Sequence, residues 1–303
     1  MKFYIFRENK MLKTCARNLV HSTNNTRNKI EYCVMLVKTK EFENYLCTLL
    51  LPFNVRTTGM IIRAFNIELA QIDALTSDLK TAQMRIQFWR ETLESIYAGR
   101  PPNHPVAISL ALCLEKQMLS KASFNKLIDI REKHLSNKPF MSLDDAATYG
   151  EYSVSPILHL IMEGLETTAP NSFLSAKHLG KACSLVTLLR SVQYFTQRRI
   201  VLLPIELCYK YSLSQEDLLR NKYPEKTKNI YKEITNYALM HIDELHKLKK
   251  SLSKTEKLIF LPSISCEIFL NNFRDLNFDI FNKKLYRRQW ILPWRLFVTT
   301  YFK

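Results

Sequence analysis

The stretch from Gly180 to Pro204, GKACSLVTLLRSVQYFTQRRIVLLP, decides the fold of this chain. Its apolar side chains recur at i, i+3, i+4, i+7 and i+10, which is the spacing of one buried stripe on a long helix. Two arginines, Arg198 and Arg199, follow the stripe, and Pro204 marks the end of the segment. The residues of the stripe are Leu185, Leu188, Leu189, Val192 and Phe195.

The composition around this stretch indicates an all-α chain. The 303 residues are 47% hydrophobic, which is enough to bury a large core, and no break in composition divides them into two domains. Five glycines occur in the whole chain. This scarcity excludes glycine-rich phosphate loops and most turn-dense β folds. We therefore expect a single helical domain.

The formal charge of +16 is partly concentrated at the N-terminus. Residues 1–30 contain seven lysines and arginines against the single acid Glu8, together with serine, threonine and asparagine. This composition predicts a mitochondrial presequence, with a disordered basic tail as the alternative. The apolar residues of the segment are too interrupted for a secretory signal or a membrane span.

The cysteines and histidines are scattered along the chain. The seven cysteines include no C-x-x-C pair, which argues against a disulfide framework and against a zinc site. His241 and His246 are five residues apart on an expected helix, about 140° around its axis, so they do not converge on one metal. We predict neither a metal nor a cofactor.

Helical periodicity, caps and prolines divide the rest of the chain into further helices. Ser77 and Ser123 are expected to be N-caps, Ser214 is expected to cap a short helix, and the chain is expected to break near Ser155–Pro156 and to kink at Pro262. The expected helices cover residues 40–51, 55–76, 77–99, 104–119, 124–135, 142–166, 224–250 and 257–269.

Several of these segments resemble the squalene and phytoene synthases. The last sequence signature of that family resembles three features here: Leu-Leu-Arg ending at Arg190, the basic cluster after it, and Leu-Pro ending at Pro204. The run Met84–Arg90, followed by Gly-Arg-Pro at 99–101 and His-Pro at 104–105, matches another. The resemblance implies an isoprenoid-synthase helical bundle around a central cavity, and it covers roughly residues 30–270.

The resemblance does not extend to the residues that bind metal in this family. In those enzymes, pairs of aspartates four residues apart on two helices hold magnesium for a prenyl diphosphate. The corresponding positions here are Ala70 and Ala74 on the first helix, and Ser191 and Phe195 on the second. Asp73 is one residue away, about 100° off the required face. Magnesium prefers carboxylate oxygens, so we expect no catalytic residue, no metal site and no synthase activity.

Other family features are expected to persist as a binding remnant. Arg190, Arg198 and Arg199 could attract an anion, and Tyr149 and Tyr152 fall where the family lines its substrate channel. For the two tyrosines, a core role with a satisfied hydroxyl is the alternative. Two further hypotheses stay open: an isoprenoid- or lipid-binding protein, and a prenyltransferase with an unrecognised metal site.

Residues 43–52, ENYLCTLLLP, and 63–70, RAFNIELA, resemble a particular branch of the family. Its members act in the assembly of mitochondrial respiratory complex I. The resemblance implies a non-enzymatic protein on the matrix side, peripheral to the inner membrane. It also implies that the partners are early complex I assembly intermediates containing the first mitochondrially encoded subunit.

The C-terminal segment 276–303 differs from the helical domain expected over 31–275. Basic and aromatic residues alternate in it, and Trp290, Trp294, Arg287, Arg288 and Arg295 could lie in an anionic membrane interface. A helix docked on the core is the equally favoured alternative. Nucleic-acid binding is less favoured, because these residues follow no single-strand-binding module.

Overall fold

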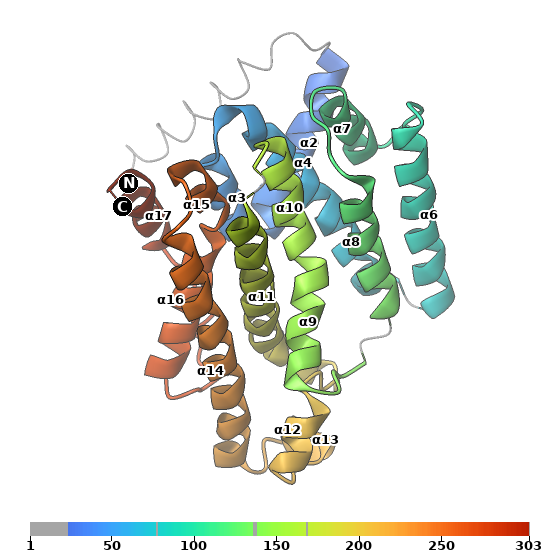
Figure 1. Ribbon diagram of the computed structural model, residues 1–303. Helices are drawn as coiled ribbons and strands as arrows, with labels where there is room; N and C mark the ends of the chain where they lie inside the picture. The colour runs from blue at the N-terminus through green and yellow to red at the C-terminus, as the bar shows by residue number, and fades with distance from the viewer. Residues whose placement is uncertain (1–23, 77, 136–137, 168, 303) are drawn as a thin grey trace.

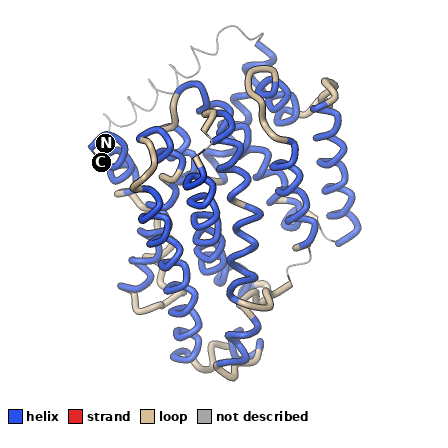
Figure 2. Tube along the Cα trace, viewed as in Figure 1, coloured by secondary structure: helices blue, strands red, loops and turns tan. Residues whose placement is uncertain are grey.

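The computed structural model describes residues 24–76, 78–135, 138–167 and 169–302 (Figure 1). Within these ranges every regular element is a helix and none is a strand, which confirms the all-α fold (Figure 2). None of the described helices is both long enough and apolar enough to cross a bilayer. The helices are α2 (Asn24–Lys40), α3 (Phe42–Leu49), α4 (Phe53–Ala70), α5 (Ile72–Leu75), α6 (Leu79–Tyr97), α7 (Pro105–Leu114), α8 (Lys121–Lys133), α9 (Leu143–Ser153), α10 (Ser155–Gly164), α11 (Pro170–Gln197), α12 (Ile205–Lys210), α13 (Gln215–Leu219), α14 (Pro224–Lys249), α15 (Lys254–Ile259), α16 (Pro262–Asp275) and α17 (Leu292–Phe302).

The long helix α11 lies between two halves of the molecule. It packs on α9 and α14, and also contacts α10 and α16 (Figure 1). On one side, the core of α2, α4, α6, α7, α8 and α10 contains Phe65, whose ring meets Trp89 and Phe124 edge-on with centroids 5.4 and 5.2 Å apart. On the other side, Leu185 and Leu189 of α11 join the core formed with α14 and α16. The apolar stripe predicted on this helix therefore belongs to the second core, whereas Ala176 and Leu179, nearer the start of α11, pack in the first.

Several expected boundaries were wrong. The helix expected to begin near Lys40 is α3, which begins at Phe42 after a break at Glu41; α2, which ends at Lys40, was not predicted. The helix expected over 55–76 ends at Ala70, where Gln71 forms its C-cap and the short α5 follows. The segment expected to kink at Pro262 is also two helices, because the proline begins α16 as its first residue.

Two caps also differ from the expectation. Asp78 caps α6, and its carboxylate accepts a hydrogen bond from the Thr81 amide; Ser77 lies outside the described residues. Ser120, three residues before the expected Ser123, caps α8. The break at Ser155–Pro156 is confirmed, since α9 ends at Ser153 and α10 begins at Ser155.

The N-terminal prediction concerns residues that are mostly outside the described ranges. Residues 1–23 are outside them, whereas 24–30 form the first part of α2, with Ile30 buried in the core. These seven residues are therefore continuous with a helix that packs on the core, and the presequence over residues 1–30 stays a prediction.

Two glycines set the distance between α9 and α11. A Cβ atom added at Gly150 would lie 2.1 Å from the carbonyl oxygen of Gly180, and one added at Gly180 would lie 2.6 Å from that of Gly150. Neither backbone can move aside without moving its helix. The first residue of the fold-deciding stretch is thus a glycine because two backbones touch there.

We predict that Gly180→Ala destabilises the protein by about 2 kcal/mol. Alanine gains about 1 kcal/mol of helix propensity, but overpacking against the Gly150 backbone and the Ser155 hydroxyl costs more than that. Urea unfolding followed by circular dichroism measures the change. Thr187→Ala, on the exposed face of the same helix, is the control and should stay within about 0.5 kcal/mol. Equal stability of Gly180→Ala and the wild type would contradict the close-contact argument.

Candidate functional site

The first pair of positions, which the sequence aligns with the family's metal ligands, does not lie on one helix. Ala70 is the last residue of α4, and Ala74 lies in α5 beyond the turn at Gln71. Both residues are exposed. Asp73, the nearest acid, is half-buried on α5.

The second pair lies on α11 and lines a small cavity. Ser191 and Phe195 face it together with Val192, Leu202 and Tyr231, and its volume of about 20 Å³ has room for one water molecule. The Ser191 hydroxyl donates a hydrogen bond to the Leu188 carbonyl at 2.8 Å. It is therefore engaged within its own helix.

These four positions do not fit magnesium. Together they offer one hydroxyl oxygen and no carboxylate, whereas magnesium in this fold requires hard, anionic oxygen ligands. Across the described residues, no cluster of three or more His, Cys, Asp or Glu side chains could hold a metal ion. We therefore assign no metal-dependent step to the four positions.

Arg190, predicted to bind an anion, is paired with a carboxylate of the protein. Its two terminal nitrogens lie 2.8 and 3.3 Å from the two carboxylate oxygens of Glu43 on α3. The Ser265 hydroxyl of α16 donates to the same carboxylate, and the guanidinium lies 4.8 Å from the Phe269 ring centroid. The bidentate pair neutralises Arg190, so an anion binding at this residue would compete with Glu43. Anion binding at Arg190 stays a prediction.

A second internal ion pair lies beside the first. Arg63 of α4, which is 5% exposed, lies 3.5 Å from the carboxylate of Glu41. Asn66 donates to Glu41 at 3.4 Å and accepts a hydrogen bond from Arg131 of α8 at 3.2 Å. Arg131 also donates to the Tyr149 hydroxyl. Tyr149 therefore has the satisfied hydroxyl of a core residue.

The sequence analysis did not predict that these residues pair. Glu43 and Arg63 lie inside the stretches 43–52 and 63–70. Nothing in those stretches indicates their partners, and the partner of Glu43, Arg190, is 147 residues away. Charge periodicity along a helix shows which face is polar; it does not show which distant helix faces it. We call the side chains of Glu41, Glu43, Arg63 and Arg190 the central charge pairs.

The other predicted residues lie away from the central charge pairs. Arg198 stacks over the Tyr194 ring at 3.6 Å, and Arg199, with a left-handed backbone at φ 58°, lies 3.9 Å from Glu216. Both side chains are exposed after the end of α11. Tyr152 is 44% exposed on α9 and does not join Tyr149.

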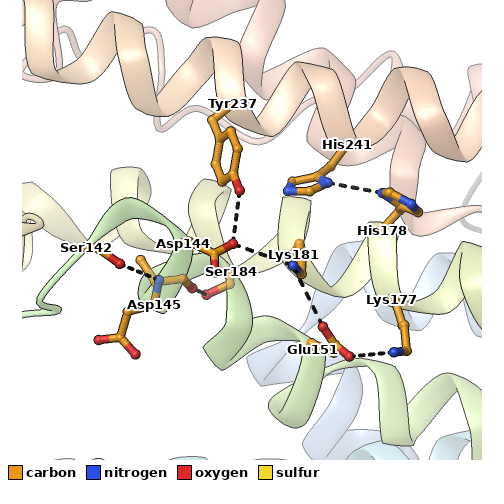
Figure 3. Close-up of polar contacts among 11 residues, drawn as sticks. Ser142, Asp144, Asp145, Glu151, Lys177, His178, Lys181, Ser184, Tyr237 and His241 are labelled. Atoms are coloured by element: carbon orange, nitrogen blue, oxygen red, sulfur yellow. Dashed lines mark hydrogen bonds and ion pairs between the residues drawn. The ribbon is translucent and has the colours of Figure 1, made fainter.

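A polar network joins side chains of α9, α11 and α14 (Figure 3). Tyr237 donates to Asp144 at 3.0 Å, and Lys181 lies 3.6 Å from Asp144. The imidazoles of His178 and His241 meet with their Nδ1 atoms 3.1 Å apart, so one donates and the other accepts (Figure 3). The accepting ring must be neutral for this hydrogen bond.

Burial keeps the histidine pair neutral. Burial, together with the smaller effects of His178 and Lys181, lowers the pKa of His241 to about 4, against an opposing effect of Asp144 and Glu244. Burial also lowers the pKa of His178. Burial therefore disfavours the uptake of a proton by either ring.

The C-terminal segment is docked on the core and keeps an exposed aromatic face. Leu292 and Leu296 of α17 are buried against α3 and α16. Trp290 and Trp294 are 87% and 59% exposed. Arg288 lies over the Phe42 ring at 3.3 Å. The hypothesis of a docked helix therefore concerns the buried face of α17. The hypothesis of membrane contact concerns the exposed residues and stays a prediction.

The whole chain is similar to proteins of one family. Residues 37–297 match the model of the squalene/phytoene synthase family. The chain belongs to this family. The match continues into α17, beyond the limit near residue 270 expected from the sequence, and α17 packs on α3 and α16.

Individual members are similar over most of their length. The chain is 35% identical over 272 residues to "NADH dehydrogenase (ubiquinone) complex I, assembly factor 6" of Homo sapiens, covering 90% of this chain and 82% of that protein. The protein of the same name in Bos taurus is 34% identical over the same length and coverage. A crystal structure of a dehydrosqualene synthase in complex with ligand superposes with a TM-score of 0.77 at 16% identity, covering 91% and 96% of the two chains. At that identity the structural likeness shows the fold alone.

We predict that Glu43→Gln and Arg190→Met each destabilise the protein and that the double variant is less affected than their sum. The side chains are 31% and 35% exposed, so solvent screening limits the coupling energy to about 1–2 kcal/mol. A double-mutant cycle in urea measures it. A coupling energy near zero would show that the pair does not hold α3 against α11.

We predict that the free energy of unfolding falls as the pH drops from 6.5 towards 4. In this window the unfolded chain binds a proton at His241 that the folded protein excludes, so stability is lost on acidification, by about 3 kcal/mol for the full pKa shift. His241→Gln should flatten the dependence. His246→Gln, at a side chain 48% exposed, is the matched control and should leave it unchanged.

Proposed function

We propose that this protein is a non-enzymatic assembly factor of mitochondrial respiratory complex I. The proposal is carried by its similarity, at 34–35% identity over 90% of the chain, to relatives named as complex I assembly factor 6. The stretches 43–52 and 63–70 that suggested this branch contain Glu43 and Arg63, two members of the central charge pairs. Its partners would be early assembly intermediates of the membrane arm.

The composition of the centre supports a role without catalysis. Ionisation of a prenyl diphosphate builds negative charge on the leaving group, which a metal or free cations must stabilise by several kcal/mol. The positions Ala70, Ala74, Ser191 and Phe195 provide no carboxylate for a metal. Arg63 and Arg190 are already neutralised by Glu41 and Glu43. An incoming diphosphate would have to displace these glutamates, which disfavours its binding.

We propose a location on the matrix side of the inner membrane, with peripheral contact. The basic composition of residues 1–30 supports import. The exposed Trp290 and Trp294, next to Arg287 and Arg295, support contact at the headgroup level of a bilayer.

One observation favours retained ligand binding as a second function. Arg131 forms no ion pair with a described carboxylate, and its Nε atom is buried without a hydrogen-bond acceptor. A buried donor of this kind costs free energy unless an acceptor meets it. An isoprenoid or lipid with an anionic head could supply that acceptor beside Tyr149. Mass spectrometry of lipid extracted from the purified protein would detect such a ligand.

We predict that deletion of the gene removes assembled complex I and leaves the other respiratory complexes in place. Native gel electrophoresis of mitochondrial membranes measures this. Re-expression of the wild type should restore the complex, and re-expression of Glu43→Gln should restore it in proportion to the amount of folded protein. Intact complex I together with altered sterols or carotenoids would overturn the proposal.

Direct assays separate this function from prenyl transfer. Purified protein with magnesium and farnesyl or geranylgeranyl diphosphate is expected to release no inorganic diphosphate. A diphosphate analogue with magnesium is expected to leave the melting temperature unchanged. Turnover in the first assay would contradict the non-enzymatic assignment, whatever the outcome for complex I.

A further inference from the structure

A large basic groove is lined by residues of α14, α15, α16 and α17. The last three helices lie together at one edge of the molecule (Figure 1). The volume of the groove is about 800 Å³, far larger than the cavity at Ser191 and Phe195. We call it the C-terminal groove. Its charged lining residues are His246, Lys249, Lys250, Lys254, Lys257, Glu267 and Arg295.

The positive charge of the C-terminal groove is not neutralised within the described part of the chain. Glu267 is its one carboxylate, and it lies 3.0 Å from His246. None of the four lysines, nor Arg295, forms an ion pair with a described residue. Five cations against one acid leave a formal charge of +4 with the histidine neutral. Such a concentration of like charges is unfavourable unless an anion enters.

Lys249 shows the cost of this arrangement. Burial lowers the pKa of its ammonium group, Lys257 lowers it further, and Glu267 partly opposes both. The free energy that disfavours the charged form would be recovered by an anionic ligand close to Lys249 and Lys257.

The other wall of the groove is apolar and leads to exposed aromatic rings. Leu258, Leu261, Ile264 and Val298 line it, with Trp294 at its edge. On α17 the docked residues Leu292 and Leu296 face the core, whereas Trp294, Phe297 and Tyr301 follow each other at intervals of three and four residues on the opposite side. We call these three residues the aromatic ridge.

The aromatic ridge is built as a continuous surface. The Trp294 and Phe297 rings stack with centroids 6.2 Å apart, and the Phe297 and Tyr301 centroids are 4.8 Å apart. The three side chains are between 44% and 59% exposed. Contiguous exposed aromatic area beside unpaired cations matches the boundary of a bilayer, where tryptophan and tyrosine lie at headgroup depth.

We propose that the C-terminal groove binds the phosphodiester headgroup of an anionic phospholipid while the aromatic ridge enters the membrane interface. This inference rests on the peripheral membrane contact proposed above, and it adds the lipid class and the residues that select it. The lysines and Arg295 supply the charge that an anionic headgroup complements, and the apolar wall accommodates the start of the acyl chains. A soluble anion or an acidic peptide would use the lysines and leave the aromatic ridge in water.

The test is vesicle co-sedimentation of the full chain. Vesicles of phosphatidylcholine alone are compared with vesicles that also contain phosphatidylglycerol. The wild type is expected to prefer the anionic vesicles. Each lysine near an anionic surface contributes about 1 kcal/mol, so Lys254→Gln together with Lys257→Gln should weaken binding on the order of 30-fold. Neither side chain is buried, and thermal unfolding checks that the variant folds.

A matched variant controls for net charge. Lys80→Gln together with Lys116→Gln removes the same charge from exposed residues of α6 and the turn after α7, at the other edge of the molecule from α17 (Figure 1). It is expected to bind anionic vesicles like the wild type. Equal weakening by both double variants would overturn the proposal, because it would reduce the effect to net charge. Wild-type binding by Lys254→Gln with Lys257→Gln would overturn it as well.

Two further arms separate this proposal from its alternatives. Stabilisation by inorganic phosphate or glycerophosphate equal to that by anionic vesicles would overturn it in favour of a free anion site. If the groove proposal alone is wrong, the wild type binds both vesicle types equally and loses binding only in Trp290→Ser with Trp294→Ser. If membrane contact itself is wrong, the wild type binds neither vesicle type, and the groove proposal falls with it. Neither result touches the complex I prediction, whose measurement is independent.

Discussion

The contact between the backbones of Gly150 and Gly180 is the constraint on which the arrangement of this protein depends. It brings α9 against α11 at a distance that no side chain at either position would allow. With that distance fixed, α11 contributes Ala176 and Leu179 to one core and its apolar stripe to the other. Helix α14 packs on α11, and the network of Asp144, Lys181 and the histidine pair lies between the three helices (Figure 3). Most of the burial in the C-terminal half follows from this placement.

Near the centre of this fold, charged side chains of the protein compensate one another. Buried charge must be compensated, and the enzymes of this family use metal ions and a substrate for that purpose. Here Glu41 and Glu43 meet Arg63 and Arg190, so the compensation is internal and permanent. The pairs also join α3 to α4 and to α11, which makes them structural connections between the two halves. A protein whose centre is closed in this way can offer its outer surface to partners and to a membrane.

The sequence was most informative where local periodicity decides the structure. The stripe of α11, the break before Pro156 and the extent of α14 all follow from apolar spacing and proline chemistry, and all were predicted. It was least informative at short-range choices between neighbouring polar residues. Ser120 and Ser123 are equally good caps by composition, and the selection of Ser120 depends on where the helix packs. The break at Glu41 likewise could not be predicted from a proline or a glycine, because neither occurs there.

By itself, the sequence determined the helical class, the family, and the residue types at the four positions aligned with the family's metal ligands, because each of these depends on residue identity and spacing along the chain. The tertiary structure alone decided what neutralises Arg190, which histidines meet, and that Lys249, Lys257 and Arg295 line one groove. The physical reason is that Coulomb and hydrogen-bond energies depend on distances through space. Glu43 and Arg190 are 147 residues apart, and no periodicity within a helix encodes such a distance.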